Sequence, residues 1–166
     1  VEMGEGYLDR TLELSPTHKK ALIAKARLAM RKGQMRTATK LYAHYVKNYP
    51  TDMEVRALLG NLYFHQGLDE NAKFELLKAV KRSPTSKVLY HLGVIYHRRN
   101  ELKKAQKFYD KALQKDPNHV DCLVSMGELF ERVGQTRRAL LHFERAYGLE
   151  PDNQYIRKKV VKLRRS

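Results

Sequence analysis

Apolar residues return along this chain at intervals of three or four positions, which is the spacing of one face of an α-helix. Between residues 19 and 30, Leu22, Ala26 and Ala29 follow this spacing and predict a first helix. The apolar pattern resumes over residues 36–48 and predicts a second helix. The chain therefore begins as a helix, a turn and another helix.

The turn between these two helices contains Gly33, which adopts a positive φ without a steric penalty and so ends a helix. Gly67 and Gly134 hold the same place later in the chain. Asn100 takes that place between them, and asparagine is the next best residue for a left-handed turn. These four positions predict four helix-turn-helix pairs.

The helix pairs repeat with a step of 33 or 34 residues. All five prolines fall on this step, at Pro16, Pro50, Pro84, Pro117 and Pro151. Small residues keep the same register, at Gly60, Gly93 and Gly127 in the first helix of a pair and at Ala72, Ala105 and Ala139 in the second. A proline stops the helix before it, because it lacks the N–H group and clashes with the preceding turn.

The unit over residues 86–119 carries the fullest set of these marker residues. They are Leu89, Leu92, Gly93, Tyr96, Ala105, Tyr109, Ala112 and Pro117, and the next unit repeats them as Leu123, Met126, Gly127, Phe130, Ala139, Phe143, Ala146 and Pro151. This pattern resembles the tetratricopeptide repeat, a 34-residue helix-turn-helix unit. The resemblance covers essentially the whole chain and implies an all-α fold, a right-handed α-solenoid.

The register divides the chain into six parts of one continuous domain. Residues 1–18 are predicted as the second helix of a truncated repeat, residues 19–52, 53–85, 86–119 and 120–153 as four full repeats, and residues 154–166 as a basic capping helix. The small residues should let the two helices of a pair cross closely. The aromatic residues of the pattern, Tyr63, Tyr96, Tyr109 and Phe143, are expected to fill the space between neighbouring repeats.

The 166 residues carry a net charge of +15, which favours encounter with acidic partners. A single cysteine, Cys122, excludes an internal disulfide and fits a reducing compartment. No apolar run approaches 18 residues, so no transmembrane segment is predicted. We expect a cytoplasmic protein, although a leader of the parent protein could be missing from this sequence.

Catalytic and metal-binding patterns are missing from the sequence: there is no phosphate-binding glycine loop, no H-E-x-x-H and no C-x-x-C. His91 and His97 are six residues apart, which is not the spacing of a helical metal pair. His65 and His97 lie on successive first helices, and an ordinary polar surface is preferred there to a metal site. We therefore expect no enzyme activity, no cofactor and no metal.

In tetratricopeptide arrays the first helices line a concave groove, so the resemblance places partner contacts on the residues that packing leaves over. These include Arg27, Arg31, Asn61, Phe64, His65, Tyr90, His91, Val94, His97, Arg98, Glu128 and Arg132. Apolar and basic side chains together suit a peptide or short helix of another protein with acidic character. The chaperone-tail clamp of some family members is excluded, because only Asn61 agrees with it and Asp121 would repel a carboxylate.

The last predicted helix is rich in positive charge. Its basic patch consists of Arg157, Lys158, Lys159, Lys162, Arg164 and Arg165. A soluble cap on the array is the preferred interpretation, and a basic tail for acidic partners is the rival. The alternative function is a helical array that binds nucleic acid or an anionic surface through its convex face and this helix. Self-association through the ends of the array is also expected as a possibility.

Overall fold

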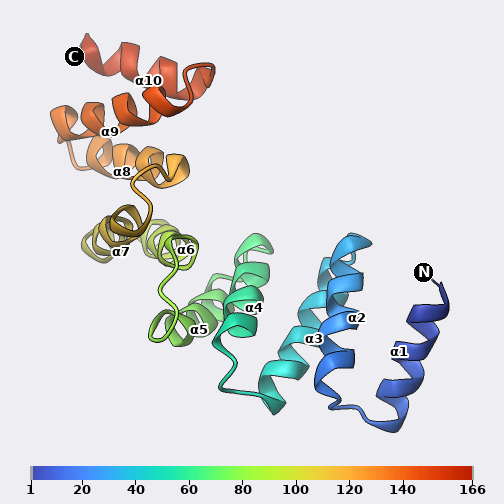
Figure 1. Ribbon diagram of the computed structural model, residues 1–166. Helices are drawn as coiled ribbons and strands as arrows, with labels where there is room; N and C mark the ends of the chain where they lie inside the picture. Colours follow the sequence, from blue (N-terminus) through green and yellow to red (C-terminus); the bar gives the residue numbers. More distant parts are fainter. Residues whose placement is uncertain (1, 166) are drawn as a thin grey trace. The chain divides into compact units, whose positions relative to one another are not determined.

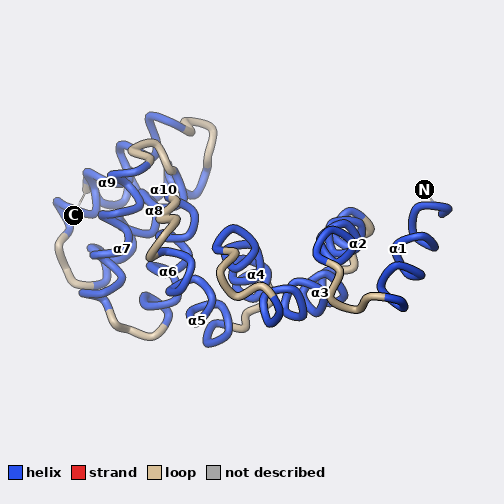
Figure 2. The backbone as a smooth tube through the Cα atoms, turned by 60° about the horizontal axis from the view of Figure 1, so that its bottom comes forward, coloured by secondary structure: helices blue, strands red, loops and turns tan. Residues whose placement is uncertain are grey.

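The structure is a computed structural model that describes residues 2–165, and all regular structure in that range is helical (Figures 1 and 2). The helices are α1 (Glu2–Leu14), α2 (Lys19–Arg31), α3 (Met35–Asn48), α4 (Met53–His65), α5 (Asp69–Val80), α6 (Ser86–Arg98), α7 (Leu102–Lys115), α8 (Val120–Arg132), α9 (Thr136–Leu149) and α10 (Gln154–Arg164). The predicted all-α class is confirmed.

The helices begin in two different ways. A side chain caps the N-terminus of α2, α4, α6, α8 and α10. The capping residues are His18, Asp52, Thr85, His119 and Asn153, in that order. Each accepts a hydrogen bond from a backbone N–H of the first turn, which would otherwise have no partner. The helices α3, α5, α7 and α9 instead follow the tight turns that the sequence predicts.

These turns have the predicted left-handed backbone. The φ angles are 71° at Gly33, 73° at Gly67, 72° at Gly134 and 61° at Asn100. The turn also returns the chain to the helix it has left, since the backbone N–H of Gln135 donates to the carbonyl of Phe130. Such closing bonds satisfy carbonyls at the end of the first helix.

The helices pair as α2 with α3, α4 with α5, α6 with α7 and α8 with α9, while α1 packs on α2 and α10 packs on α9. The contacts divide the chain after Ser83 into two compact units. Unit 1 contains α1 to α5 and unit 2 contains α6 to α10.

In the pairs α4/α5, α6/α7 and α8/α9 the two helices cross at a glycine. A Cβ atom on Gly93 would come within 2.4 Å of the Tyr109 ring, and one on Gly127 within 2.7 Å of the Phe143 ring. Gly60 has the same relation to Leu76, at 2.7 Å. The prediction that these glycines permit a close crossing is confirmed.

The position of the aromatic rings adds a contact within the pair to the predicted one. Tyr109 and Phe143 lie against the glycine of their own helix pair and also reach the next repeat, as we expected, since Tyr109 hydrogen-bonds with Ser125 of α8 and Lys159 of α10 lies 5.7 Å from the Phe143 ring centroid. Tyr96 is half-buried and stacks on Phe108 of its own pair, with ring centroids 5.4 Å apart. The rings are drawn into the pair because the glycine leaves a space of their size there.

The first full repeat has no glycine at the crossing and uses alanine and tyrosine together. Tyr45 is fully buried in one cluster with Ala26 and Ala29. Its hydroxyl donates a 2.7 Å hydrogen bond to Asp52 Oδ2. Burial first, and then this carboxylate, raise the pKa of Tyr45, so the phenol stays neutral.

Unit 1 also buries an ion pair that the sequence analysis missed. Arg56 of α4 donates to Glu75 Oε2 of α5 at 2.5 Å and, through Nε, to the carbonyl of Pro50 at 2.8 Å. Both side chains are almost wholly inside the helix pair. A charge at that depth needs a partner of opposite sign, and here each residue supplies it for the other.

Candidate protein-binding surface

In unit 2 the first helices α6 and α8 contact each other. Tyr90 of α6 is half-buried, and its ring centroid lies 4.8 Å from that of His119, which caps α8. Its hydroxyl hydrogen-bonds with Ser125 on α8. Burial raises the pKa of Tyr90, and the bond to Ser125 acts in the opposite direction. Tyr90 therefore joins the two helices and leaves part of its ring exposed.

His97 lies two turns further along α6, and its Nδ1 atom is 3.3 Å from the hydroxyl of Tyr109. Burial, followed by the positive charge of Arg132, lowers the pKa of His97, while Glu128 raises it. Both of these charged residues are on α8, so His97 is held beside that helix. The imidazole is consequently biased toward its neutral form.

The residues that the two first helices place together form what we call the α6–α8 surface. It consists of Tyr90, Val94, His97, Arg98, Glu128 and Arg132. Arg98 and Arg132 are exposed, and the other four are half-buried. All six belong to the residues that the packing pattern predicts for the groove.

One predicted groove residue lies elsewhere. His91 is only 4% exposed and belongs to the core of unit 2. This corrects its placement on the binding surface, because a side chain at that depth offers a partner no area. The error arose because His91 was assigned by subtraction from the marker positions, while its neighbours Leu92 and Val88 draw that side of α6 inward.

The predicted groove residues of unit 1 divide into two groups. Arg27 and Arg31 line a hollow of about 430 Å³ beside α1, together with Gly4, Glu5, Leu8, Ala24 and Leu28. Arg27 also hydrogen-bonds with the hydroxyl of Tyr42. Asn61, Phe64 and His65 lie on α4 and do not line this hollow. The structure brings the unit 1 residues together less well than those of the α6–α8 surface.

Helix α10 covers part of the acidic edge of α8. Lys159 and Lys162 donate to the two carboxylate oxygens of Glu131, at 2.5 and 2.9 Å. These bonds, with that of Lys159 the stronger, lower the pKa of Glu131. The hydroxyl of Tyr155 donates to Glu128 at 2.5 Å. The chain itself thus occupies Glu128 and Glu131, two acidic residues of α8.

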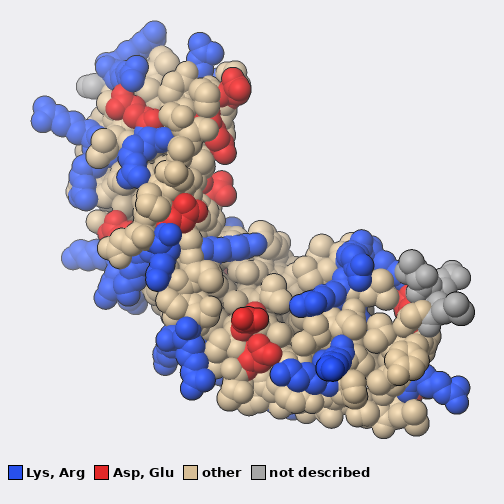
Figure 3. All heavy atoms as spheres, viewed as in Figure 1, with Lys and Arg blue, Asp and Glu red and all other residues tan. Residues whose placement is uncertain are grey.

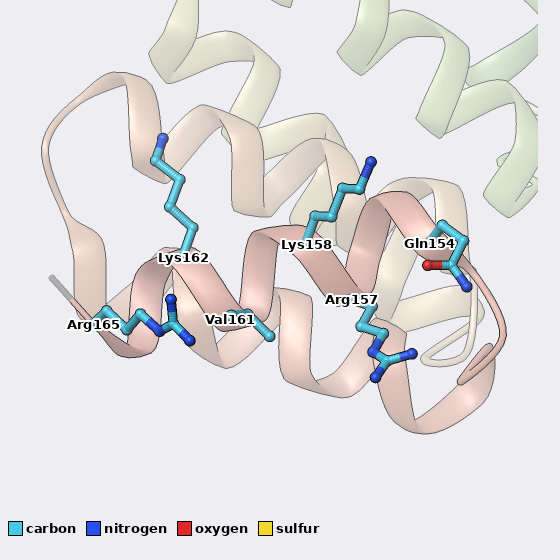
Figure 4. A pocket seen from close by; sticks show the side chains of 6 residues that line it. All are labelled: Gln154, Arg157, Lys158, Val161, Lys162 and Arg165. Carbon is cyan, nitrogen blue, oxygen red and sulfur yellow. The ribbon is translucent and has the colours of Figure 1, made fainter.

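The same contacts divide the predicted basic patch. Lys159 and Lys162 are paired with Glu131, and Arg164 is paired with Glu144 at 2.7 Å. Within residues 2–165, the other three have no carboxylate partner, and these are Arg157, Lys158 and Arg165. They line a shallow hollow of about 480 Å³ with Gln154, Val161 and Lys162 (Figure 4). Single-helix spacing does not reveal these pairs, because they form between different helices, as between Glu131 of α8 and Lys159 of α10.

Charge on the surface is scattered. On the face drawn in Figure 3, Lys and Arg side chains lie in separate groups with uncharged and acidic surface between them. In the part of the chain that the structure describes, no three His, Cys, Asp or Glu side chains are grouped so as to hold a metal ion. No helix of residues 2–165 is both long and apolar enough to cross a membrane.

Three family models described as tetratricopeptide repeat match the chain, over residues 23–87, 86–119 and 108–141. Together they cover most of the four helix pairs. The chain belongs to the tetratricopeptide repeat family. The middle match has the same bounds as the unit that carries the fullest set of marker residues in the sequence.

The chain is also similar to part of a curated protein and to solved structures of the same fold. Protein O-mannosyl-transferase TMTC1 of Mus musculus is 26% identical over 159 residues, which are 93% of this chain and 17% of the relative. The chain thus spans about a sixth of that protein's length. The crystal structure of MamA superposes with a TM-score of 0.80 at 19% identity, covering 87% of this chain and 80% of the other. The structure of YrrB gives 0.77 at 16% identity, over 94% and 81%.

Proposed function

We propose that this chain is a non-catalytic scaffold that holds a peptide or short helix of a partner protein on the α6–α8 surface. The general role of a protein-interaction scaffold follows from the tetratricopeptide fold. The observation that carries the specific proposal is the meeting of Tyr90, Val94 and His97 with Arg132 on two adjacent first helices. Partly exposed aromatic and arginine side chains supply much of the binding energy at protein interfaces.

The charge of this surface favours an acidic partner. Glu128 accepts a hydrogen bond from Tyr155, and Glu131 is neutralised by two lysines. Arg98 and Arg132 remain exposed at the ends of α6 and α8. A guanidinium forms two parallel hydrogen bonds with a carboxylate, which fixes both the position and the direction of an acidic peptide.

The comparisons add support of two kinds. The structural neighbour YrrB is described as a tetratricopeptide protein with an unusual peptide-binding site, so this fold holds peptides in at least one neighbour. TMTC1 is named a transferase, but the stretch similar to this chain is 17% of it. We assign this chain the binding role and no transferase chemistry.

A peptide library displayed on phage and selected on the purified chain would test the proposal. We expect the selected peptides to be acidic and to lose binding by tenfold or more with Val94→Asp or Arg132→Glu. Arg137→Glu, an equal charge change at an exposed position of α9, is the matched control and should have little effect. Selected peptides that bind the Val94→Asp and Arg132→Glu variants unchanged would refute the assignment to this surface.

A polyanion-binding role is the second candidate, and a lysine row on α7 favours it. Lys103, Lys107 and Lys111 line a shallow hollow of about 400 Å³. Asp110 lies in the same hollow and weakens its positive field. Binding of single-stranded DNA with a steep dependence on salt, unaffected by Val94→Asp, would support this role over the scaffold.

A further inference from the structure

At one position of the first helix, two repeats have an arginine where the others have a leucine. Six residues after the proline, or five residues after Pro84, where the repeat is one residue shorter, the first helix turns a side chain toward the second helix of its pair. The side chains at this position are Leu22, Arg56, Leu89 and Leu123 in α2, α4, α6 and α8, and Arg157 in α10. The first four are buried, whereas Arg157 is exposed. Arg157 is thus the counterpart of Arg56.

Unit 1 shows how this fold accommodates an arginine at that position. The guanidinium of Arg56 is held by Glu75, which comes from the second helix, α5. The carbonyl of Pro50 accepts its Nε–H. An arginine here is therefore compatible with a helix packed against it when that helix brings a glutamate.

The rest of α10 keeps one packing face and changes the other. Ile156, Val160 and Leu163 are buried, as are their counterparts on α8, and they hold α10 on α9. The positions that α8 turns toward its second helix are Leu123, Gly127 and Phe130. On α10 these positions hold Arg157, Val161 and Arg164, and of these Arg164 is paired with Glu144 of α9. The second face of α10 is therefore suited to a charged partner and not to an apolar helix such as α9.

This second face has a defined shape and charge. Figure 4 shows Gln154, Arg157, Val161 and Arg165 in line along α10, with Lys158 and Lys162 beside them. Val161 is 43% exposed at the centre of the hollow that these six residues line. Of the four cations around this apolar centre, Lys162 is paired with Glu131, whereas Arg157, Lys158 and Arg165 have no carboxylate partner within residues 2–165. This combination matches an amphipathic helix that carries carboxylates. A polyanion such as a nucleic acid would make no favourable contact with the side chain of Val161.

We propose that this face of α10 binds a glutamate-bearing helix of a partner protein, packed on α10 as α5 packs on α4. A glutamate of that helix pairs with Arg157, as Glu75 pairs with Arg56. The residue that follows the glutamate is small, because Val161 occupies the place of a glycine. At that place in unit 1, a Cβ on Gly60 would already come within 2.7 Å of Leu76.

The helix α5 itself supplies the probe. We would use a peptide with the sequence of Asp69–Val80 carrying Leu76→Ala, which makes room for Val161. Phe74→Glu, at a position exposed on α5, allows a lactam bridge to Lys78 on the outer side of the peptide. The bridge is needed because a helix of this length is marginal in water by itself. The control peptide also carries Glu75→Gln.

The affinity is measured by fluorescence anisotropy for the full chain and for Arg157→Gln. We expect the Glu75→Gln peptide and the Arg157→Gln chain each to weaken binding roughly tenfold. Combined, they should weaken it no further than either alone, because both remove the same contact. Lys107→Gln on α7 removes an equal charge at an exposed position and should leave the affinity unchanged.

A second variant separates this helix from other occupants. Val161→Asp should abolish peptide binding, while circular dichroism and the unfolding midpoint stay near those of the original chain, since Val161 is exposed. The proposal is overturned if the two arginine and glutamate changes add independently, or if Val161→Asp leaves binding intact. It is also overturned if single-stranded DNA competes with the peptide, or if sedimentation shows a second copy held through Arg157.

Discussion

The helix pairs α4/α5 and α6/α7 have the same close crossing, but a buried ion pair joins the helices of the first and an aromatic stack joins those of the second. At one position of the second helix the first pair has Glu75 and the other has Phe108. Glu75 is held by a buried arginine of α4, whereas Phe108 stacks on Tyr96 of α6. The glycine crossing is the same in both pairs. The glycine crossing therefore fixes how closely the two backbones approach. The position of Glu75 and Phe108 can hold a charged or an aromatic residue, provided that the first helix supplies a side chain that pairs with it.

A third pair stands between these two. His142 of α9 occupies the same position and stacks on Phe130, with ring centroids 5.4 Å apart. The ring resembles that of Phe108 in its contact and differs from it in polarity. Its Nδ1 atom is buried and has no hydrogen-bond partner in the described part of the chain. The ring of His142 thus packs well against Phe130, while its buried Nδ1 atom lacks a hydrogen bond.

The largest effect is expected from breaking the ion pair. Glu75→Ala should lower the free energy of unfolding by about 3–5 kcal/mol, because it leaves the Arg56 charge buried without a partner. Replacing both residues by those of the other pair, Arg56→Leu with Glu75→Phe, should restore most of that loss. Urea denaturation followed by circular dichroism measures both. A single variant as stable as the double one would show that the charge is satisfied by water.

The glycine crossing gives the next effect. Gly93→Ala should lower the free energy of unfolding by about 1–3 kcal/mol, since its Cβ would meet the Tyr109 ring and force the two helices apart. Gly148→Ala in α9 is the matched control, because its Cβ meets no atom within 4 Å. That change should stabilise the chain by about 0.5–1 kcal/mol through helix propensity. Equal effects of the two variants would contradict the role of the crossing.

The sequence predicts the backbone arrangement of these helix pairs better than it predicts which side chains pair between the helices. The period of prolines, the turns at Gly33 and Asn100 and the close crossings follow from residues that few backbones accept. The pairing of Arg56 with Glu75 and of Glu131 with Lys159 depends on which side chains meet across helices, and single-helix spacing does not reveal it. Comparing Arg56 with Leu89 and Leu123 in the repeat register was the signal that would have located the first of them.

The candidate surface was predicted in part for the same reason. Setting aside the packing residues of the repeat pattern left Tyr90 and His97 for the groove, and the structure brings both beside α8. The same step failed at His91, because burial depends on the neighbouring helix and not only on the register. The sequence also did not predict that Tyr155 and two lysines of α10 hydrogen-bond with Glu128 and Glu131 of α8.

The unmatched polarity of His142 should appear as a dependence on pH. Burial, and then the positive charges of Arg145 and Arg138, lower the pKa of His142 below its ordinary value of 6.5. As the pH falls below 6.5 the unfolded chain binds a proton that the folded chain does not, so the stability decreases. This loss continues until the pH reaches the lowered pKa. Unfolding midpoints between pH 8 and pH 5 would measure it.

His142→Phe copies Phe108 into α9 and provides the control. The variant should lose less stability than the original chain between pH 8 and pH 5, because one histidine with a lowered pKa is gone. His97, whose pKa burial also lowers, remains in the variant and retains part of the dependence. Identical pH profiles for the two chains would show that His142 does not contribute.

The smallest effect is expected from an ion pair at the surface, which completes the contrast with Arg56 and Glu75. Lys162 donates to Glu131, but its side chain is 70% exposed, so water replaces the lost contact. Lys162→Ala should change the free energy of unfolding by less than about 0.5 kcal/mol. Because Glu131 keeps its bond to Lys159, no carboxylate is left without a partner. A loss comparable to that of Glu75→Ala would mean that burial does not distinguish the two pairs.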